Sequence, residues 1–197
     1  MKFKLFGTEI YLSFLFLAVI TVMLATDKTG YMLPALFAVS SHEAGHLFMM
    51  WLLECAPKRI KLIPASVQIS MPMLKCYRND ILVALSGPAV NIVLFFTLYF
   101  NYIAYKNEAV LVYALLNLVI ALFNLLPVKG LDGGTVLYCL LCKNLDINKA
   151  TLIIKLITLI LALSVIAVAV ILTLNHKLNI SLYIMGIYLI VMTLIKI

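Results

Sequence analysis

One stretch decides the fold class: His42-Glu43-Ala44-Gly45-His46, set within the apolar run 31–53. Residues i and i+4 of an α-helix share a face, so His42 and His46 can bind one metal ion together. Glu43 follows His42 directly and can reach a water molecule that is bound to the metal. Ionisable groups inside an apolar membrane segment are costly, and they usually mark functional sites. The stretch therefore predicts a metal-binding helix within a lipid bilayer.

The composition is that of a membrane protein with several crossings. The 197 residues are 65% hydrophobic and 12% charged, which is far more apolar than a soluble domain requires. The formal net charge is +7, and basic residues flank membrane helices on their cytoplasmic side. Because the chain has no basic soluble face, we expect no nucleic-acid partner. In this setting the histidine motif predicts a zinc hydrolase that works within the bilayer or at its rim.

Six apolar segments each approach the roughly 20 residues that cross a bilayer. They cover 10–25, 31–53, 81–105, 109–126, 152–174 and 180–195. The fourth breaks at Pro127 and resumes after Asp132, because proline stops a helix. We therefore predict an all-α polytopic membrane protein with about six transmembrane helices. All of residues 1–197 are expected to form a single membrane-embedded domain.

The stretch 56–80 differs in kind, since it holds three prolines and five Lys or Arg residues. Its apolar residues partly alternate, at Ile60 and Leu62 and again at Val67 and Ile69. Alternation favours strands over a helix. We predict a short β-hairpin or re-entrant loop between the second and third transmembrane helices. An extended substrate could pair with this hairpin by strand addition.

The distribution of basic residues predicts the orientation of the chain. With six crossings, one side holds Lys2, Lys4, Lys58, Arg59, Lys61, Lys75, Arg78, Lys143, Lys149 and Lys196. The other side holds Lys28, Lys106 and Lys177. The positive-inside rule then places both termini in the cytoplasm. It also places the histidine motif and Asp132 at compatible depths on the cytoplasmic side of the bilayer.

A catalytic zinc site needs three protein ligands and one open position, so a third ligand must join the two histidines. The remaining histidine, His176, falls in a predicted loop on the opposite side. Glu54 lies two helical turns beyond His46, about 12 Å away. Asp132 is the better candidate, because it lies on the side of the motif in a stretch broken by Pro127 and three glycines. An ordinary turn aspartate is the competing interpretation, since Asp-Gly is a common turn pair.

Four cysteines are spread along the chain, at 55, 76, 139 and 142. They do not have the spacing of a disulfide framework. Cys139 and Cys142 have the C-x-x-C spacing of redox and metal sites, but they lie in the apolar run 137–142. We interpret them as small apolar residues on a helix.

Three motifs together resemble one protein family. They are His42-Glu43-Ala44-Gly45-His46, Ser86-Gly-Pro-Ala-Val-Asn91 at the start of the third segment, and Asn124-x-x-Pro-x-x-x-x-Asp132-Gly in the fourth. Their order and spacing are similar to those of the site-2 protease family of intramembrane zinc metalloproteases. Within that family, the compact size and N-terminal pattern are most similar to the stage IV sporulation protein FB group.

The resemblance implies three ligands for one Zn²⁺ ion per chain: His42, His46 and Asp132. It implies that Glu43 is the general base and that Asn124 lies near the substrate or the oxyanion of the tetrahedral intermediate. Asn91 would line the site or pack the helices beside Gly87. The chain departs from the family pattern at Lys129-Gly130, where a second proline usually precedes Leu-Asp-Gly. No PDZ or CBS domain is expected.

The activity implied by the resemblance is intramembrane metalloendopeptidase cleavage near the cytoplasmic side of a bacterial cell membrane. The substrate would be a transmembrane or membrane-associated protein, such as a sigma-factor precursor, an anti-sigma factor or a remnant signal peptide. An inhibitory membrane partner fits the same setting. Two alternatives stay open: a metal transporter whose His and Asp side chains line an ion path, and a catalytically silent family member that acts as a membrane scaffold.

Overall fold

The structure is a computed structural model, and it describes residues 2–5, 8–12, 14–55, 59–63, 66–70, 77–175 and 179–194. The chain forms two compact units, Met1–Phe123 and Asn124–Ile197. His176, which we expected in a loop, lies outside the described residues.

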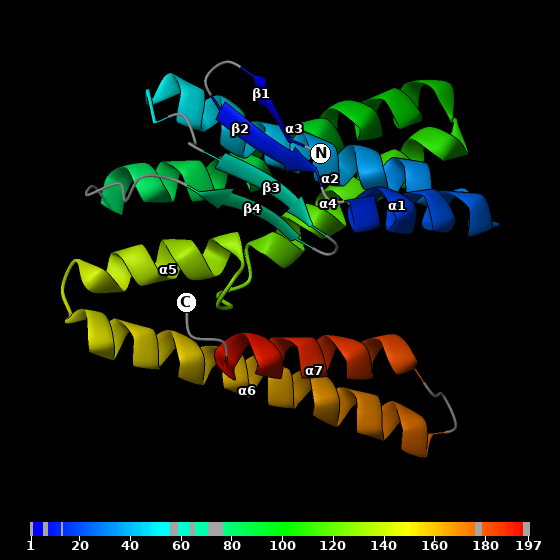
Figure 1. Cartoon of the computed structure of the whole chain (residues 1–197). Helices are drawn as coiled ribbons and strands as arrows, with labels where there is room; N and C mark the ends of the chain where they lie inside the picture. The colour runs from blue at the N-terminus through cyan, green and yellow to red at the C-terminus, as the bar shows by residue number, and fades with distance from the viewer. Residues whose placement is uncertain are drawn as a thin grey trace. The chain divides into compact units, whose positions relative to one another are not determined.

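The first unit contains a four-stranded sheet with the order β1-β2-β3-β4 (Figure 1). Its strands are β1 (Lys2–Leu5), β2 (Thr8–Leu12), β3 (Arg59–Ile63) and β4 (Ser66–Ser70). The outer pairs are antiparallel, whereas β2 and β3 are parallel, with Ile10 opposite Ile60. Strands β3 and β4 lie in the stretch for which we predicted a hairpin or re-entrant loop.

Strands β1 and β2 were not predicted, and the expected helical start at residue 10 is wrong. The helix begins at Phe14, because residues 8–12 pair with β1 on one side and β3 on the other. The partner β3 is distant in the sequence, so no local pattern in the N-terminal residues reveals this pairing.

Four helices complete the first unit: α1 (Phe14–Thr26), α2 (Met32–Leu52), α3 (Tyr77–Tyr105) and α4 (Glu108–Asn124), whose last residue opens the second unit. Helices α2 and α3 pack together. A Cβ atom at Gly45 would lie 2.7 Å from the Ser86 carbonyl oxygen. The absence of a side chain there lets the two backbones approach closely.

The turn between α1 and α2 is organised by Asp27. Its Oδ1 accepts hydrogen bonds from the Thr29 hydroxyl at 2.7 Å and the Thr29 N–H at 2.9 Å, and its Oδ2 accepts one from the Met32 N–H at 2.9 Å. These bonds, the Thr29 hydroxyl first, hold the pKa of Asp27 below its usual range. Gly30 supplies the positive φ of 74° that the turn requires. Asp27 and Gly30 together therefore form the turn that separates α1 from α2.

The second unit contains α5 (Asp132–Cys142), α6 (Ile147–Leu174) and α7 (Ile180–Leu194). Helices α6 and α7 run side by side in opposite directions (Figure 1), and α5 packs on α6. The predicted break is confirmed, since α4 ends at Asn124 and α5 begins at Asp132. Cys139 and Cys142 are free thiols on α5, as interpreted from the sequence.

The interior is built from small and polar residues, and large apolar residues face outward. Fully buried positions include Ala38, Ala114, Ala121, Asn91, Asn117, Ala150, Thr158, Ala162 and Ala169. Phe48, Trp51 and Ile160 are 60%, 70% and 65% exposed. This distribution is typical of helices that pack through small residues and present apolar side chains to lipid.

Among the described residues, two helical spans are long and apolar enough to cross a membrane: Arg78–Tyr105 and Ile147–Leu174. The other expected segments coincide with helices that are shorter or more polar. The count of six crossings and the cytoplasmic termini therefore stay predictions.

Candidate metal centre

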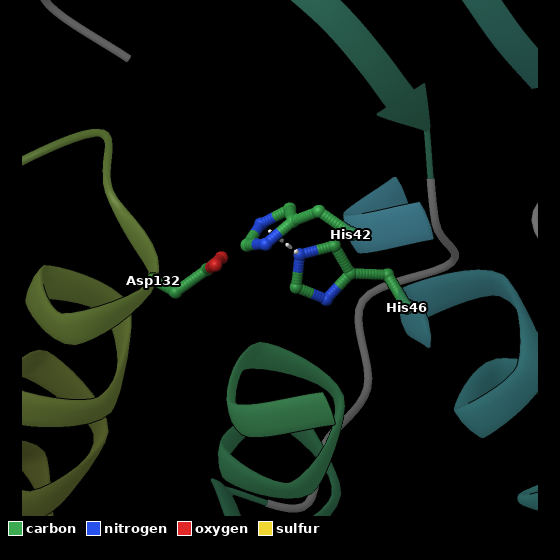
Figure 2. A group of neighbouring side chains, drawn as sticks. All are labelled: His42, His46 and Asp132. Atoms are coloured by element: carbon green, nitrogen blue, oxygen red, sulfur yellow. Dashed lines mark hydrogen bonds between the residues drawn. The ribbon is translucent and has the colours of Figure 1, made fainter. Parts of the chain in front are cut away.

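The two histidines of α2 form a pair. His42 and His46 are 5% and 7% exposed, and their Nε2 atoms lie 3.1 Å apart (Figure 2). The rings are nearly perpendicular, with an interplanar angle of 86°. Two nitrogens that bind zinc at 2.0–2.1 Å with a tetrahedral angle lie about 3.3 Å apart. The observed separation therefore fits two ligands of one tetrahedral zinc ion.

The other nitrogen of each ring is held by α3. The Nδ1–H of His46 donates to the Val83 carbonyl oxygen at 2.8 Å, and the Nδ1 of His42 is 2.8 Å from the Oδ1 of Asn91. A partner at Nδ1 fixes the ring orientation and makes Nε2 the atom that the ring offers to a metal. The pair is thus arranged for coordination through both Nε2 atoms.

Gly87 of α3 provides the surface on which both rings lie. A Cβ atom at this position would be 2.5 Å from the Nε2 of His46 and 2.9 Å from the Cε1 of His42. Any side chain here would displace the imidazoles. The positions of the two histidine rings therefore require glycine at residue 87.

Glu43 is half-buried and follows His42 directly on α2. A carboxylate in this position beside the ligands is the usual general base of an H-E-x-x-H motif. Glu54, the alternative ligand considered from the sequence, lies beyond the end of α2. It is exposed and has a positive φ of 55°, so its role is to terminate the helix.

The third candidate ligand, Asp132, belongs to the second unit, where it is the first residue of α5 (Figure 2). Its carboxylate gives it the chemistry of a zinc ligand. Gly133 and Gly134 follow it because any Cβ there would collide with the backbone of Leu125 and Val128. The segment 125–131 therefore packs directly on the first turn of α5 and fixes the start of this helix at Asp132.

The departure from the family pattern, Lys129-Gly130, forms part of this segment. The Lys129 N–H donates to the Oγ1 of Thr158 on α6 at 2.9 Å, and Gly130 has a positive φ of 93°. These two residues also line a cavity of about 350 Å³, together with Gly134, Thr135, Tyr138, Thr151 and Ile154. The departure thus coincides with a cavity inside the second unit.

Comparisons with known proteins agree with this architecture. No family model matches the chain. The site-2 protease from Methanocaldococcus jannaschii superposes with a TM-score of 0.71 at 22% identity, over 100% of this chain and 97% of that one. The fold is that of a site-2 protease. The fold that the resemblance implies is therefore confirmed.

A sequence relative has the name of the group to which the compact size and N-terminal pattern are most similar. Stage IV sporulation protein FB of Bacillus subtilis (strain 168) is 30% identical over 129 residues, which cover 62% of this chain and 45% of the relative. The chain thus matches about half the length of that protein.

Within the site-2 protease fold, sequence reasoning missed one contact of the metal centre. Asn117 of α4 is fully buried and accepts a hydrogen bond from Asn91 at 2.8 Å. The available signal was an amide in the middle of the apolar fourth segment, and polar residues at membrane depth usually bind a partner. Asn124, predicted near the substrate, is half-buried at the end of α4.

Proposed function

We propose that the chain is an intramembrane zinc metalloendopeptidase. The observation that carries the proposal is the pair of buried imidazoles with Nε2 atoms 3.1 Å apart. Such a pair, with Glu43 between its two members in the helix, is typical of zinc hydrolases. The site-2 protease fold and the sporulation protein relative support the same activity.

In this proposal Asp132 is the third ligand and joins His42 and His46 at one zinc ion. Each of the three residues offers one ligand atom of the kind that zinc prefers. The two units would then act as one membrane-embedded protease domain, because the ligand set draws on both. The expectation of a single domain follows from this proposal.

Zinc, when bound, supplies a Lewis acid that lowers the pKa of water to about 7. Glu43 accepts the proton of the attacking water and later donates it to the nitrogen of the leaving amine. The amide of Asn124 donates a hydrogen bond to the oxygen that becomes negative during attack. Asn91 does not share this role, because its amide nitrogen already donates two hydrogen bonds inside the protein.

The proposed substrate is a transmembrane or membrane-associated protein cut near the cytoplasmic side. A sigma-factor precursor or an anti-sigma factor fits the relation to the sporulation protein. The chain would lie in a bacterial cell membrane with both termini in the cytoplasm, and an inhibitory membrane partner would act in the same bilayer. The outward-facing apolar residues support the membrane setting.

The substrate must be extended before attack, because a helical substrate has its carbonyl groups hydrogen-bonded internally. The sheet order leaves β4 at an edge, and an edge strand can pair with an extended peptide. We place the substrate strand beside β4. Photocrosslinkers at positions 67 and 69 should capture a co-expressed substrate, and failure at both positions would contradict this part of the proposal.

The activity is tested by zinc content and by cleavage of a co-expressed transmembrane substrate. Glu43→Gln should keep zinc and lose cleavage, whereas Glu54→Gln, an exposed acid at the end of the same helix, should keep both. Metal transport that survives Glu43→Gln would indicate a transporter. Absence of cleavage by the native chain and by both variants would indicate a scaffold.

The third ligand is tested separately. Asp132→Asn should reduce zinc from one ion per chain to substoichiometric amounts. Asp146→Asn is the matched control, since Asp146 also lies at the start of a helix but its side chain is 80% exposed. Equal zinc retention in the two variants would exclude Asp132 as a ligand.

A further inference from the structure

Three buried amide and imidazole side chains from three helices form one chain of hydrogen bonds. The Nδ2 of Asn117 on α4 donates to the Tyr113 carbonyl oxygen at 2.8 Å. The Nδ2 of Asn91 on α3 donates to the Oδ1 of Asn117 at 2.8 Å. The Oδ1 of Asn91 faces the Nδ1 of His42 on α2 at 2.8 Å. Both asparagines are fully buried.

The direction of each bond follows from the first. A backbone carbonyl can only accept, so the Tyr113 oxygen attracts the amino group of Asn117 and turns its Oδ1 toward Asn91. That oxygen also only accepts, and so does the Ala38 carbonyl oxygen, which receives the second N–H of Asn91 at 2.9 Å. The amino group of Asn91 is therefore fixed between two acceptors, and its Oδ1 must face His42.

The consequence reaches the metal ligand. Because the Oδ1 of Asn91 can only accept, the Nδ1 of His42 must carry the proton. Neutral imidazole has one proton on its two nitrogens, so the lone pair then lies on Nε2, the atom that faces His46 at 3.1 Å. Without Asn117, Asn91 would keep one acceptor for its amino group and could rotate its amide.

We propose that Asn117 is a positioning residue that selects the Nε2 ligand form of His42 through Asn91. The inference rests on the proposed function, because it concerns the orientation of the proposed metal ligand. It gives Asn117 a part in the metal centre, although this residue lies outside the three family motifs. It also explains why an amide is buried between Tyr113 and Asn91. An apolar side chain at this position would need no hydrogen-bond partner.

The test uses the purified full chain with ¹⁵N-labelled histidine, whose rings give few signals because the chain has three histidines. In the metal-free native protein, His42 should be a single tautomer with the proton on Nδ1. Asn117→Leu, which removes the acceptor but keeps a side chain branched at Cγ, should give a mixture of tautomers. Asn117→Asp keeps an acceptor oxygen and should preserve the native tautomer.

Zinc affinity, measured by chelator competition, is the second readout. Asn117→Leu should weaken zinc binding by about 10-fold, the low end of the effect for partners of metal-binding histidines. Asn117→Asp should stay within about 2-fold of the native protein on the same basis. If the leucine variant does not fold, Asn117→Ala removes the same acceptor without adding apolar branches and carries the same expectations.

Thr173→Val is the control, because it removes a part-buried hydroxyl that bonds within α6 of the second unit and should leave the His42 signals unchanged. A single Nδ1–H tautomer in Asn117→Leu and Asn117→Ala would overturn the inference. Equal loss in the leucine and aspartate variants would also overturn it, since packing alone would then explain both. The tautomer is read without metal, so absence of zinc binding would contradict the proposed function while leaving this test intact.

Discussion

The contact between Gly87 and the two imidazoles makes Gly87→Ala the most direct perturbation of the metal centre. The added Cβ would lie 2.5 Å from the Nε2 of His46, 2.6 Å from its Cε1 and 2.9 Å from the Cε1 of His42. Ordinary contacts of a Cβ atom begin at 3.4 Å. The His46 ring must therefore move by about 1 Å to restore van der Waals contact.

A shift of that size is large for a metal ligand. Zinc–nitrogen distances lie at 2.0–2.1 Å, and functional sites keep within about 0.2 Å of such values. Crowding of a packed interior costs about 1–3 kcal/mol, and a 1 Å misplacement of reacting groups lowers rates by about 100-fold. We expect Gly87→Ala to lose at least about 100-fold in zinc affinity and in cleavage.

The assay is zinc competition with a chelator, together with thermal unfolding of the metal-free protein. Gly186→Ala on α7 is the matched control. Its Cβ would lie 2.5 Å from the Cγ1 of Ile166 on the neighbouring helix α6. It introduces similar crowding without touching a ligand, so zinc affinity should stay native. Native zinc affinity in Gly87→Ala would refute the argument that the rings depend on this surface.

Three further predictions concern the turns and the break. Asp27→Asn should lower the melting temperature at neutral pH, because the native carboxylate is stabilised by the hydrogen bonds that depress its pKa. The stability from the Asp27 carboxylate is present above its unfolded pKa of about 3.9 and is lost as the pH falls through its lower folded pKa. The melting curves of the native chain and the variant should therefore converge in acid. Thr158→Val removes the acceptor of the Lys129 N–H. It should lower the free energy of unfolding by about 1–3 kcal/mol and speed the loss of zinc. A melting temperature equal to that of Thr151→Val, whose hydroxyl bonds within its own helix, would contradict this. Gly133→Ala should abolish zinc retention, because its Cβ collides with backbone in the break; a zinc-loaded variant would show that the break can move.

The sequence predicts the parts of the molecule that depend on local chemistry. The two histidines follow from helical spacing, and the break before Asp132 follows from Pro127 and its glycines. The turn at Asp27 follows from residues that act on their own neighbours. Each of these features is determined within about ten residues of chain, the range over which turn and helix rules operate.

The features that the sequence did not predict depend on residues far apart. Asn117 contacts Asn91 from 26 positions away, and the need for glycine at 87 comes from side chains on another helix. The contact of Asn91 with His42 belongs to the same class, because the orientation of an amide is decided by acceptors that only packing brings together.

The parallel pairing of β2 with β3 has a consequence for biosynthesis. Glu9 of β2 pairs with Arg59 of β3. After it has added Glu9, a ribosome must therefore add 50 more residues, including α1 and α2, before it reaches Arg59. At about 5–20 residues per second this takes about 3 to 10 s. Throughout that interval the N-terminal hairpin exposes the open edge of β2. The sheet can therefore close only after both preceding helices have been made, and the nascent chain needs its edge protected until then.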